Sequence, residues 1–325
     1  MNAAAFVLIA AMIAGYVILD GYDLGLGAIH LLYARTDRER SASLAAIGPF
    51  WNGNEVMLIS AAATLFALFP KAYAASFSGF YLPFIIVLWL LMVRGMSIEL
   101  RGHFESDLWR GFWDVGFSIS SALLALLFGV AIGNIIRGVP LDSSGYFTGT
   151  FSFLLNGYAL AVGVFALLAL AMHGAAFAWM RTDGVIADRA QRITRLLPFA
   201  VFVLFAIVTA MTLFIHPAAR NPALWLAPIL AFVALVGVLL ARNGAAALVA
   251  SSLMLLALVT SAATTLFPSL LPSYPSGAGL DIYNAAPNAY SLNNAFFVAA
   301  IGFGAVLVYG TLAMRRMLAR RIGKS

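Results

Sequence analysis

The chain has 325 residues, of which 63% are hydrophobic and only 10% are charged, with a mean hydropathy of +0.96. Soluble domains carry roughly a quarter charged residues, so this composition excludes a protein whose outer surface faces water. The net charge of +6 does not indicate nucleic-acid binding, because the basic residues are scattered over short connections. The absence of cysteine excludes disulfides, thiolate-bound iron–sulfur clusters and cysteine-containing zinc sites.

Nine apolar stretches follow one another along the chain, and each has about the length that a helix needs to cross a bilayer. They lack strict alternation, which favours helices over a barrel. We therefore expect an all-α polytopic protein forming a single integral membrane domain over residues 1–325, with the first span retained rather than cleaved. The expected spans lie near residues 4–30, 51–69, 79–98, 112–136, 152–180, 196–216, 222–241, 246–267 and 292–314.

Basic residues are distributed unequally between the two sets of connections. If the N-terminus lies outside, the outer connections hold only Lys71, Arg137 and Arg220, and Arg94 falls within a span. This asymmetry predicts an outer N-terminus and a cytoplasmic C-terminus. The remaining basic residues fall on the inner side: Arg35, Arg38, Arg40, Arg101, Arg110, Arg181, Arg189, Arg192, Arg195, Arg242, Arg315, Arg316, Arg320, Arg321 and Lys324.

The longest connection, Pro268–Asn288, then lies outside and contains no lysine or arginine. We expect it to be a plain connector rather than a dedicated binding element.

Few ionisable residues lie within the expected spans, and each is a functional candidate because a charge in the bilayer is costly. Asp20 and Asp23 occupy neighbouring faces near the inner end of the first span. Glu55 opens the second span, and Arg94 and Glu99 lie toward the end of the third. Successive spans alternate in direction, so these groups share one depth near the inner side.

Asn52 and Asn54 are placed to bridge this expected cluster of acids and arginine. Two interpretations remain open, and they are compatible. One is a structural ion-pair cluster in which Arg94 neutralises an acid and the other groups reach headgroup water. The other is a proton path from the cytoplasm through Asp23 and Glu55, because buried carboxyl groups can exchange protons near neutral pH.

Of the four histidines, His30, His103 and His216 fall at span ends or in connections, where we expect interfacial solvation. His173 lies deep in the fifth span. A hydrogen bond to a neighbouring helix is the favoured interpretation there, and an axial haem ligand is the alternative. The glycines that follow Asp20 indicate close helix packing rather than a phosphate-binding loop. No hydrolytic or zinc motif occurs, so no catalytic or metal site is expected in this chain.

Two adjacent motifs carry a family resemblance: Gly21-Tyr22-Asp23-Leu24-Gly25 and the run from Ile47 to Val56, Ile-Gly-Pro-Phe-Trp-Asn-Gly-Asn-Glu-Val. Together they resemble subunit II of the cytochrome bd-type quinol oxidases. Similar segments continue along nearly the whole chain: Thr64–Ala67, Phe69-Pro70, Phe77–Tyr81, Glu99–Arg101, Gly133-Asn134, Gly138–Pro140, Thr148-Gly149, His173–Ala175, Met180–Thr182, Phe267-Pro268 and Leu271-Pro272. The chain departs from the pattern at Met57, where an aromatic residue is usual, and in a short connection over residues 217–222.

The resemblance implies a non-haem subunit of a complex that oxidises membrane quinol and reduces dioxygen to water. It implies nine helices in two four-helix bundles plus one additional helix, in a bacterial cell (inner) membrane. The expected partners are a haem-bearing subunit I holding haem b and haem d, membrane lipid and quinol, but no nucleic acid. A small single-helix accessory subunit and a structural quinone on this chain stay open.

The resemblance also places Asp23 and the segment Trp51–Glu55 at a proton channel or a subunit-facing polar site. Position 52 is often aspartate in the family, and Asn52 cannot titrate, so Asp23 and Glu55 would carry more of any relay. A proton-coupled secondary transporter using the same acids is the alternative function. Transporters usually place their sites near the midplane on broken helices, whereas these charges lie toward one side.

Overall fold

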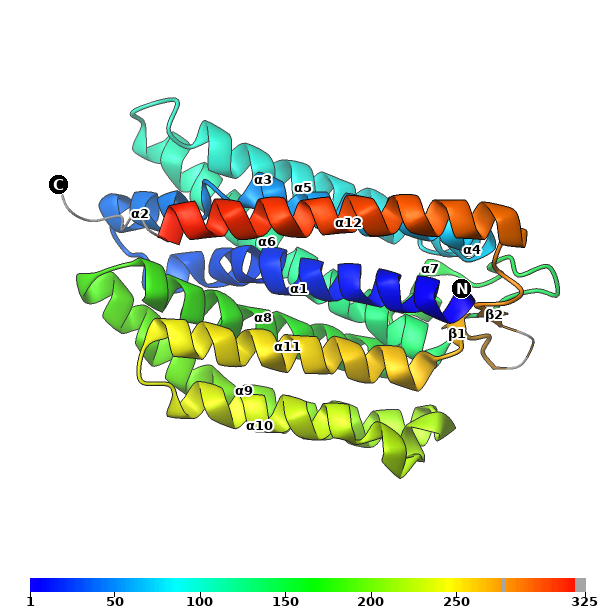
Figure 1. Cartoon of the computed structure of the whole chain (residues 1–325). Coiled ribbons are helices and arrows are strands. Elements are labelled where there is room, and N and C mark those ends of the chain that lie inside the picture. Colours follow the sequence, from blue (N-terminus) through cyan, green and yellow to red (C-terminus); the bar gives the residue numbers. More distant parts are fainter. Residues whose placement is uncertain (276, 278, 319–325) are drawn as a thin grey trace.

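The computed structural model describes residues 1–275, 277 and 279–318, and it is dominated by long helices that run side by side (Figure 1). Among the described residues, eight helices are long and apolar enough to cross a membrane. Helix α3 is 18 residues long but opens with the polar segment Trp51–Glu55. The long helices are α1 (Asn2–Tyr33), α3 (Trp51–Leu68), α5 (Tyr81–Leu100), α6 (Asp107–Arg137), α8 (Gly157–Arg181), α9 (Gly184–Ile215), α10 (Leu226–Leu240), α11 (Gly244–Leu266) and α12 (Ala289–Leu318).

Short elements gather at the two ends of this bundle. Helix α2 (Asp37–Ile47) lies at the end where α1 finishes, and the N-terminus lies at the opposite end with α4, α7 and the strands (Figure 1). Within the connection over residues 268–288, β1 and β2 pair antiparallel. The short elements of the second end are α4 (Pro70–Gly79), α7 (Phe151–Leu154), η1 (Pro217–Arg220), η2 (Pro222–Leu224), β1 (Ser269–Leu271) and β2 (Leu280–Asp281).

Two helices begin at residues that the apolar windows did not predict. The Asn156 side chain accepts a hydrogen bond from the Ala159 N–H, which starts α8 after the separate turn of α7. Helix α9 begins at Gly184, well before the expected start near residue 196. Ile186, Ala190 and Thr194 recur at four-residue spacing on one buried face, so packing extends this helix through a polar segment.

Helix α1 lies at the centre of the fold and contacts α3, α6, α8 and α11. Helices α5 and α6 pack together beside it, α8 to α11 pack against one another, and α12 lies along α3 and α1. The closest approach is between α1 and α8, where Gly25 faces the Leu170 carbonyl and Gly174 faces the Gly25–Leu26 backbone. Both positions need glycine because the two backbones touch, which confirms the expected role in close packing.

We predict that Gly25→Ala destabilises the protein, because the added methyl group would overlap backbone rather than a side chain that can move. Overpacking of this kind costs about 1–3 kcal/mol. Gly111→Ala is the matched control, since a Cβ there has nothing within 4 Å. Thermal unfolding of both variants in detergent should show a lowered Tm only for Gly25→Ala, and equal Tm values would contradict the packing argument.

Candidate functional site

A buried ion-pair cluster is centred on Arg94 of α5. The guanidinium is fully buried and binds Asp20 of α1 through two contacts, Nη2 to Oδ1 at 2.5 Å and Nη1 to Oδ2 at 3.0 Å. Glu55 of α3 lies 3.3 Å from Nη1, and Asp23 Oδ2 lies 3.8 Å from Nη2. The structure thus brings together four of the residues selected from the sequence, and we call them the acidic cluster.

Asn54 attaches α3 to the same cluster. Its Nδ2 lies 2.7 Å from Asp23 Oδ2 and 2.9 Å from the Tyr22 hydroxyl. The structure does not bring Asn52 or Glu99 into the cluster, because both side chains are exposed. Helical geometry explains this difference: Asn52 points away from the buried face of α3 that carries Asn54, and Glu99 lies five residues beyond Arg94 on another face of α5.

The charges of the acidic cluster do not balance. Three carboxyl groups share one guanidinium, and Asp20, Asp23 and Arg94 are fully buried. Asp23 Oδ1 has no hydrogen-bond partner among the described residues. An uncompensated buried charge is costly, so a proton bound within the cluster relieves the excess of negative charge. The arrangement can therefore accept and release protons, with Glu55 as the member whose side chain is one-quarter exposed.

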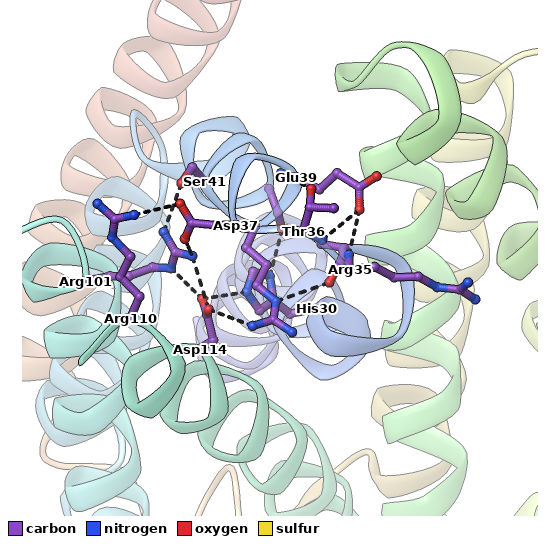
Figure 2. A network of polar contacts seen from close by, with 12 residues as sticks. His30, Arg35, Thr36, Asp37, Glu39, Ser41, Arg101, Arg110 and Asp114 are labelled. Carbon is purple, nitrogen blue, oxygen red and sulfur yellow. Dashed lines mark hydrogen bonds and ion pairs between the residues drawn. The ribbon is translucent and has the colours of Figure 1, made fainter. Parts of the chain in front are cut away.

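A second polar network lies at the end of the bundle beside α2, and Figure 2 shows how its side chains converge on Asp114 of α6. Asp114 accepts from Arg101 Nε at 2.5 Å and from Arg40 at 3.3 Å, and His30 Nε2 lies 3.1 Å away. Arg101 also donates to Asp37 of α2 at 2.7 Å. The network therefore ties α1, α2, α5 and α6 together.

His30 is fully buried in this second network, so the expectation of interfacial solvation is wrong for this residue. Its Nδ1 lies 3.0 Å from the Ser43 hydroxyl, which accepts from the Tyr33 hydroxyl at 2.6 Å. The reason is tertiary: α2 folds back over the end of α1 and covers the imidazole. His103 is exposed as expected, and His216 is half-buried.

Asp114 was not among the residues selected from the sequence, although its position in the sequence marks it as a candidate. This carboxyl group stands within the apolar run from Phe112 to Phe117, where each charged residue should have been a candidate.

Helix α2 was not predicted from the sequence either. It begins with a capping box in which Glu39 accepts from the backbone of Arg35 and Thr36. These N–H groups, the Arg35 N–H most of all, and Arg189 hold the pKa of Glu39 below its usual value.

His173 does not fit an axial haem ligand in this fold. Its Nε2 donates to the Ile18 carbonyl at 3.0 Å, and its Nδ1 lies 2.7 Å from the Ser251 hydroxyl. Both ring nitrogens are engaged, which confirms the favoured interpretation of a hydrogen bond to a neighbouring helix. Within the described part of the chain, no group of three histidine, cysteine, aspartate or glutamate side chains is placed to hold a metal ion.

The fold and the site define a multi-pass helical membrane protein with a buried acidic cluster and a polar network at one end. Residues 1–317 match the family described as cytochrome bd terminal oxidase subunit II, and the chain belongs to this family. The resemblance read from the sequence motifs is thereby confirmed.

Individual relatives agree with this assignment. Cytochrome bd-I ubiquinol oxidase subunit 2 of Escherichia coli K12 is 32% identical, with 97% of this chain and 93% of that protein covered. Cytochrome bd ubiquinol oxidase subunit 2 of Bacillus subtilis is 35% identical over 61% of this chain and 59% of that protein. A chain of the bd oxidase from Geobacillus thermodenitrificans has the same fold, with a TM-score of 0.80, 17% identity, and 98% and 99% of the two chains covered.

The chain is therefore a subunit of a quinol oxidase complex and a multi-pass protein of the bacterial inner membrane.

We predict that Asp20→Asn destabilises the complex more than Glu55→Gln does. Asp20 neutralises Arg94 through two short contacts inside the protein, and removing one partner of a buried pair costs about 3–5 kcal/mol. Glu55 makes one 3.3 Å contact and is partly exposed, so its loss should cost less. Tryptophan fluorescence during heating of the purified complex measures both Tm values. A larger loss for Glu55→Gln would contradict the assignment of Asp20 as the main partner.

Proposed function

We propose that this subunit supports a haem-bearing subunit I and conducts protons from the cytoplasm through the acidic cluster. One observation carries the proposal: three carboxyl groups from α1 and α3 share one buried guanidinium from α5. A purely structural pair would need one acid for one arginine. The surplus of acids gives the cluster groups that can bind a proton and pass it on.

We further propose nine membrane spans, with α3 as the ninth, the N-terminus outside and the C-terminus in the cytoplasm. In support, α2 and its neighbouring connections collect arginines at one end of the bundle, whereas Lys71 and Arg220 belong to elements of the opposite end. The proposed arrangement also has two four-helix bundles, α1, α3, α5 and α6 in one and α8 to α11 in the other, with α12 as the additional helix. Contacts of α5 with α6 and of α10 with α11 lie within these groups, and α8 joins the groups by packing on α1 and α6. Arg320, Arg321 and Lys324 of the proposed cytoplasmic tail lie outside the described residues.

The haems b and d of the complex are assigned to subunit I, because His173, the one deeply placed histidine selected from the sequence, is engaged at both nitrogens. A small single-helix accessory subunit completes the proposed partners. We also propose that a structural quinone binds this subunit. An apolar cavity of about 500 Å³, whose walls include Phe128, Phe165 and Phe205, supports this proposal. Family membership disfavours the alternative of a secondary transporter.

We predict that Asp23→Asn and Glu55→Gln each slow quinol-dependent oxygen consumption and cytoplasmic proton uptake by the assembled complex about tenfold or more, since each removes a proton acceptor. Asp107→Asn and Glu105→Gln are matched controls, because both acids are exposed on the same end of the bundle. Haem content of each preparation is measured first, so that a loss of assembly is recognised. Unchanged turnover in both cluster variants of the assembled complex would exclude the relay.

We predict that His173→Gln leaves the visible haem spectrum of the assembled complex unchanged, since the imidazole is used in hydrogen bonds between helices. The spectrum is compared per complex with that of the unsubstituted protein. Loss of the bands of one haem from an otherwise assembled complex would contradict the assignment of all haems to subunit I.

A further inference from the structure

Helix α1 carries a continuous polar stripe along one buried face. Tyr16, Asp20, Asp23, Gly27 and His30 follow at spacings of four, three, four and three residues, which places them on one side of a helix. All five are buried. Asp20 and Asp23 belong to the acidic cluster, and His30 belongs to the network around Asp114, two turns nearer the cytoplasmic end. The two sites are therefore stacked along one helix face.

Helices α5 and α6 carry matching stripes of buried polar residues. Arg94, Ser97 and Arg101 follow at spacings of three and four on α5. Asp114, Ser118 and Ser121 follow at spacings of four and three on α6. The stripes meet at both ends, where Arg94 binds Asp20 and Arg101 binds Asp114. We call the three stripes together the polar seam.

Two glycines let the stripes approach between these ends. A Cβ on Gly27 of α1 would overlap the Ser121 hydroxyl, so that hydroxyl occupies the space beside the α1 backbone. A Cβ on Gly116 of α6 would lie 3.0 Å from Ser97 Oγ. The seam is thus closed by direct contacts of α6 with both α1 and α5, and hydroxyl groups line its middle.

Four buried polar atoms in the seam have no partner among the described residues. They are Tyr16 Oη, Asp23 Oδ1, Arg94 Nε and Ser121 Oγ, and all four side chains are buried. An unpaired buried hydroxyl costs about 1–3 kcal/mol, and buried water is the usual partner of such groups. None of these four atoms takes part in the ion pairs described above. Their position points to water in the seam.

The spacing of the seam suits a short water chain. His30 and Asp23 are seven residues apart on α1, which corresponds to about 10 Å along the helix axis. That gap is too long for direct proton transfer, but two or three waters and the Ser121 hydroxyl would bridge it. At the cytoplasmic end of the seam, Asp114 lies at Nε2 of His30 (Figure 2). The Ser43 hydroxyl lies at Nδ1 of the same ring.

We propose that the polar seam is a hydrated route along which protons pass from the network of His30 and Asp114, past Ser121, to Asp23. The inference rests on the proposed function of the acidic cluster and adds the path that supplies it. Each step breaks one O–H or N–H bond and forms another on the next group, so no electron is transferred. In this scheme His30 is a relay residue, and Asp114, which is paired with Arg101 and Arg40, is a positioning residue. Ser121 supplies the hydroxyl group between His30 and Asp23.

The test compares Ser121→Ala with Ser120→Ala in the assembled complex. Both serines are buried on α6, but the Ser120 hydroxyl donates to the Phe117 carbonyl of its own helix. Ser121→Ala should lower cytoplasmic proton uptake and turnover about threefold or more with little change in Tm, because the Ser121 hydroxyl makes no hydrogen bond to another protein group among the described residues. Ser120→Ala should leave uptake and turnover unchanged. Unchanged uptake in Ser121→Ala, or an equal loss in both variants, would overturn the route.

A second measurement reports hydration without depending on turnover. The chain contains no cysteine, so Ser121→Cys and Ser120→Cys each introduce one thiol into it. Infrared difference spectra of the complex, taken against the cysteine-free chain in the same complex, follow the S–H stretch after transfer to heavy water. Exchange should be clearly faster at position 121 than at 120, and equal rates would overturn a hydrated seam.

The two proposals fail separately. If Asp23→Asn and Glu55→Gln both leave turnover unchanged, the relay function of the acidic cluster is excluded, whatever the thiol exchange shows. If Asp23→Asn slows turnover but Ser121 shows neither the uptake defect nor faster exchange, the cluster keeps its function and the seam is overturned.

Discussion

The structure depends on one buried positive charge. Arg94 can remain ionised inside an apolar bundle only because Asp20 meets it with both carboxylate oxygens, and Asp23 and Glu55 lie close by. This requirement fixes the relative positions of α1, α3 and α5 along their axes. The site also contains three carboxyl groups for one guanidinium. The residues that neutralise Arg94 therefore include acids that can bind a proton.

The second network extends the same principle toward the end of the bundle that carries α2. Asp114 collects Arg101, Arg40 and His30, and Arg101 continues to Asp37 on α2. Helix α2 is thereby held against the ends of the long helices. The chain continues from α2 into α3, which carries Asn54 and Glu55. The two polar sites are thus connected in two ways: α2 and α3 are consecutive in the chain, and one face of α1 carries residues of both sites.

Fold and site are under different physical constraints in this family. The bd oxidase chain from Geobacillus thermodenitrificans has the same fold at 17% identity, so this fold forms although most aligned positions carry different residues. Lipid-facing positions need only remain apolar. Positions such as Gly25 and Gly174 are different, because two helix backbones touch there and leave no room for a side chain.

The sequence by itself determined the helical membrane class, the approximate spans, the family and the residues Asp20, Asp23, Glu55 and Arg94, because apolar length and intramembrane charge are local properties. Only the tertiary structure decided which neighbours join them. It placed Asn54 rather than Asn52 beside Asp23, and it buried His30 against Asp114 by folding α2 over α1. Which face of a helix is covered depends on how helices pack around it, and residue spacing along one helix does not specify that packing.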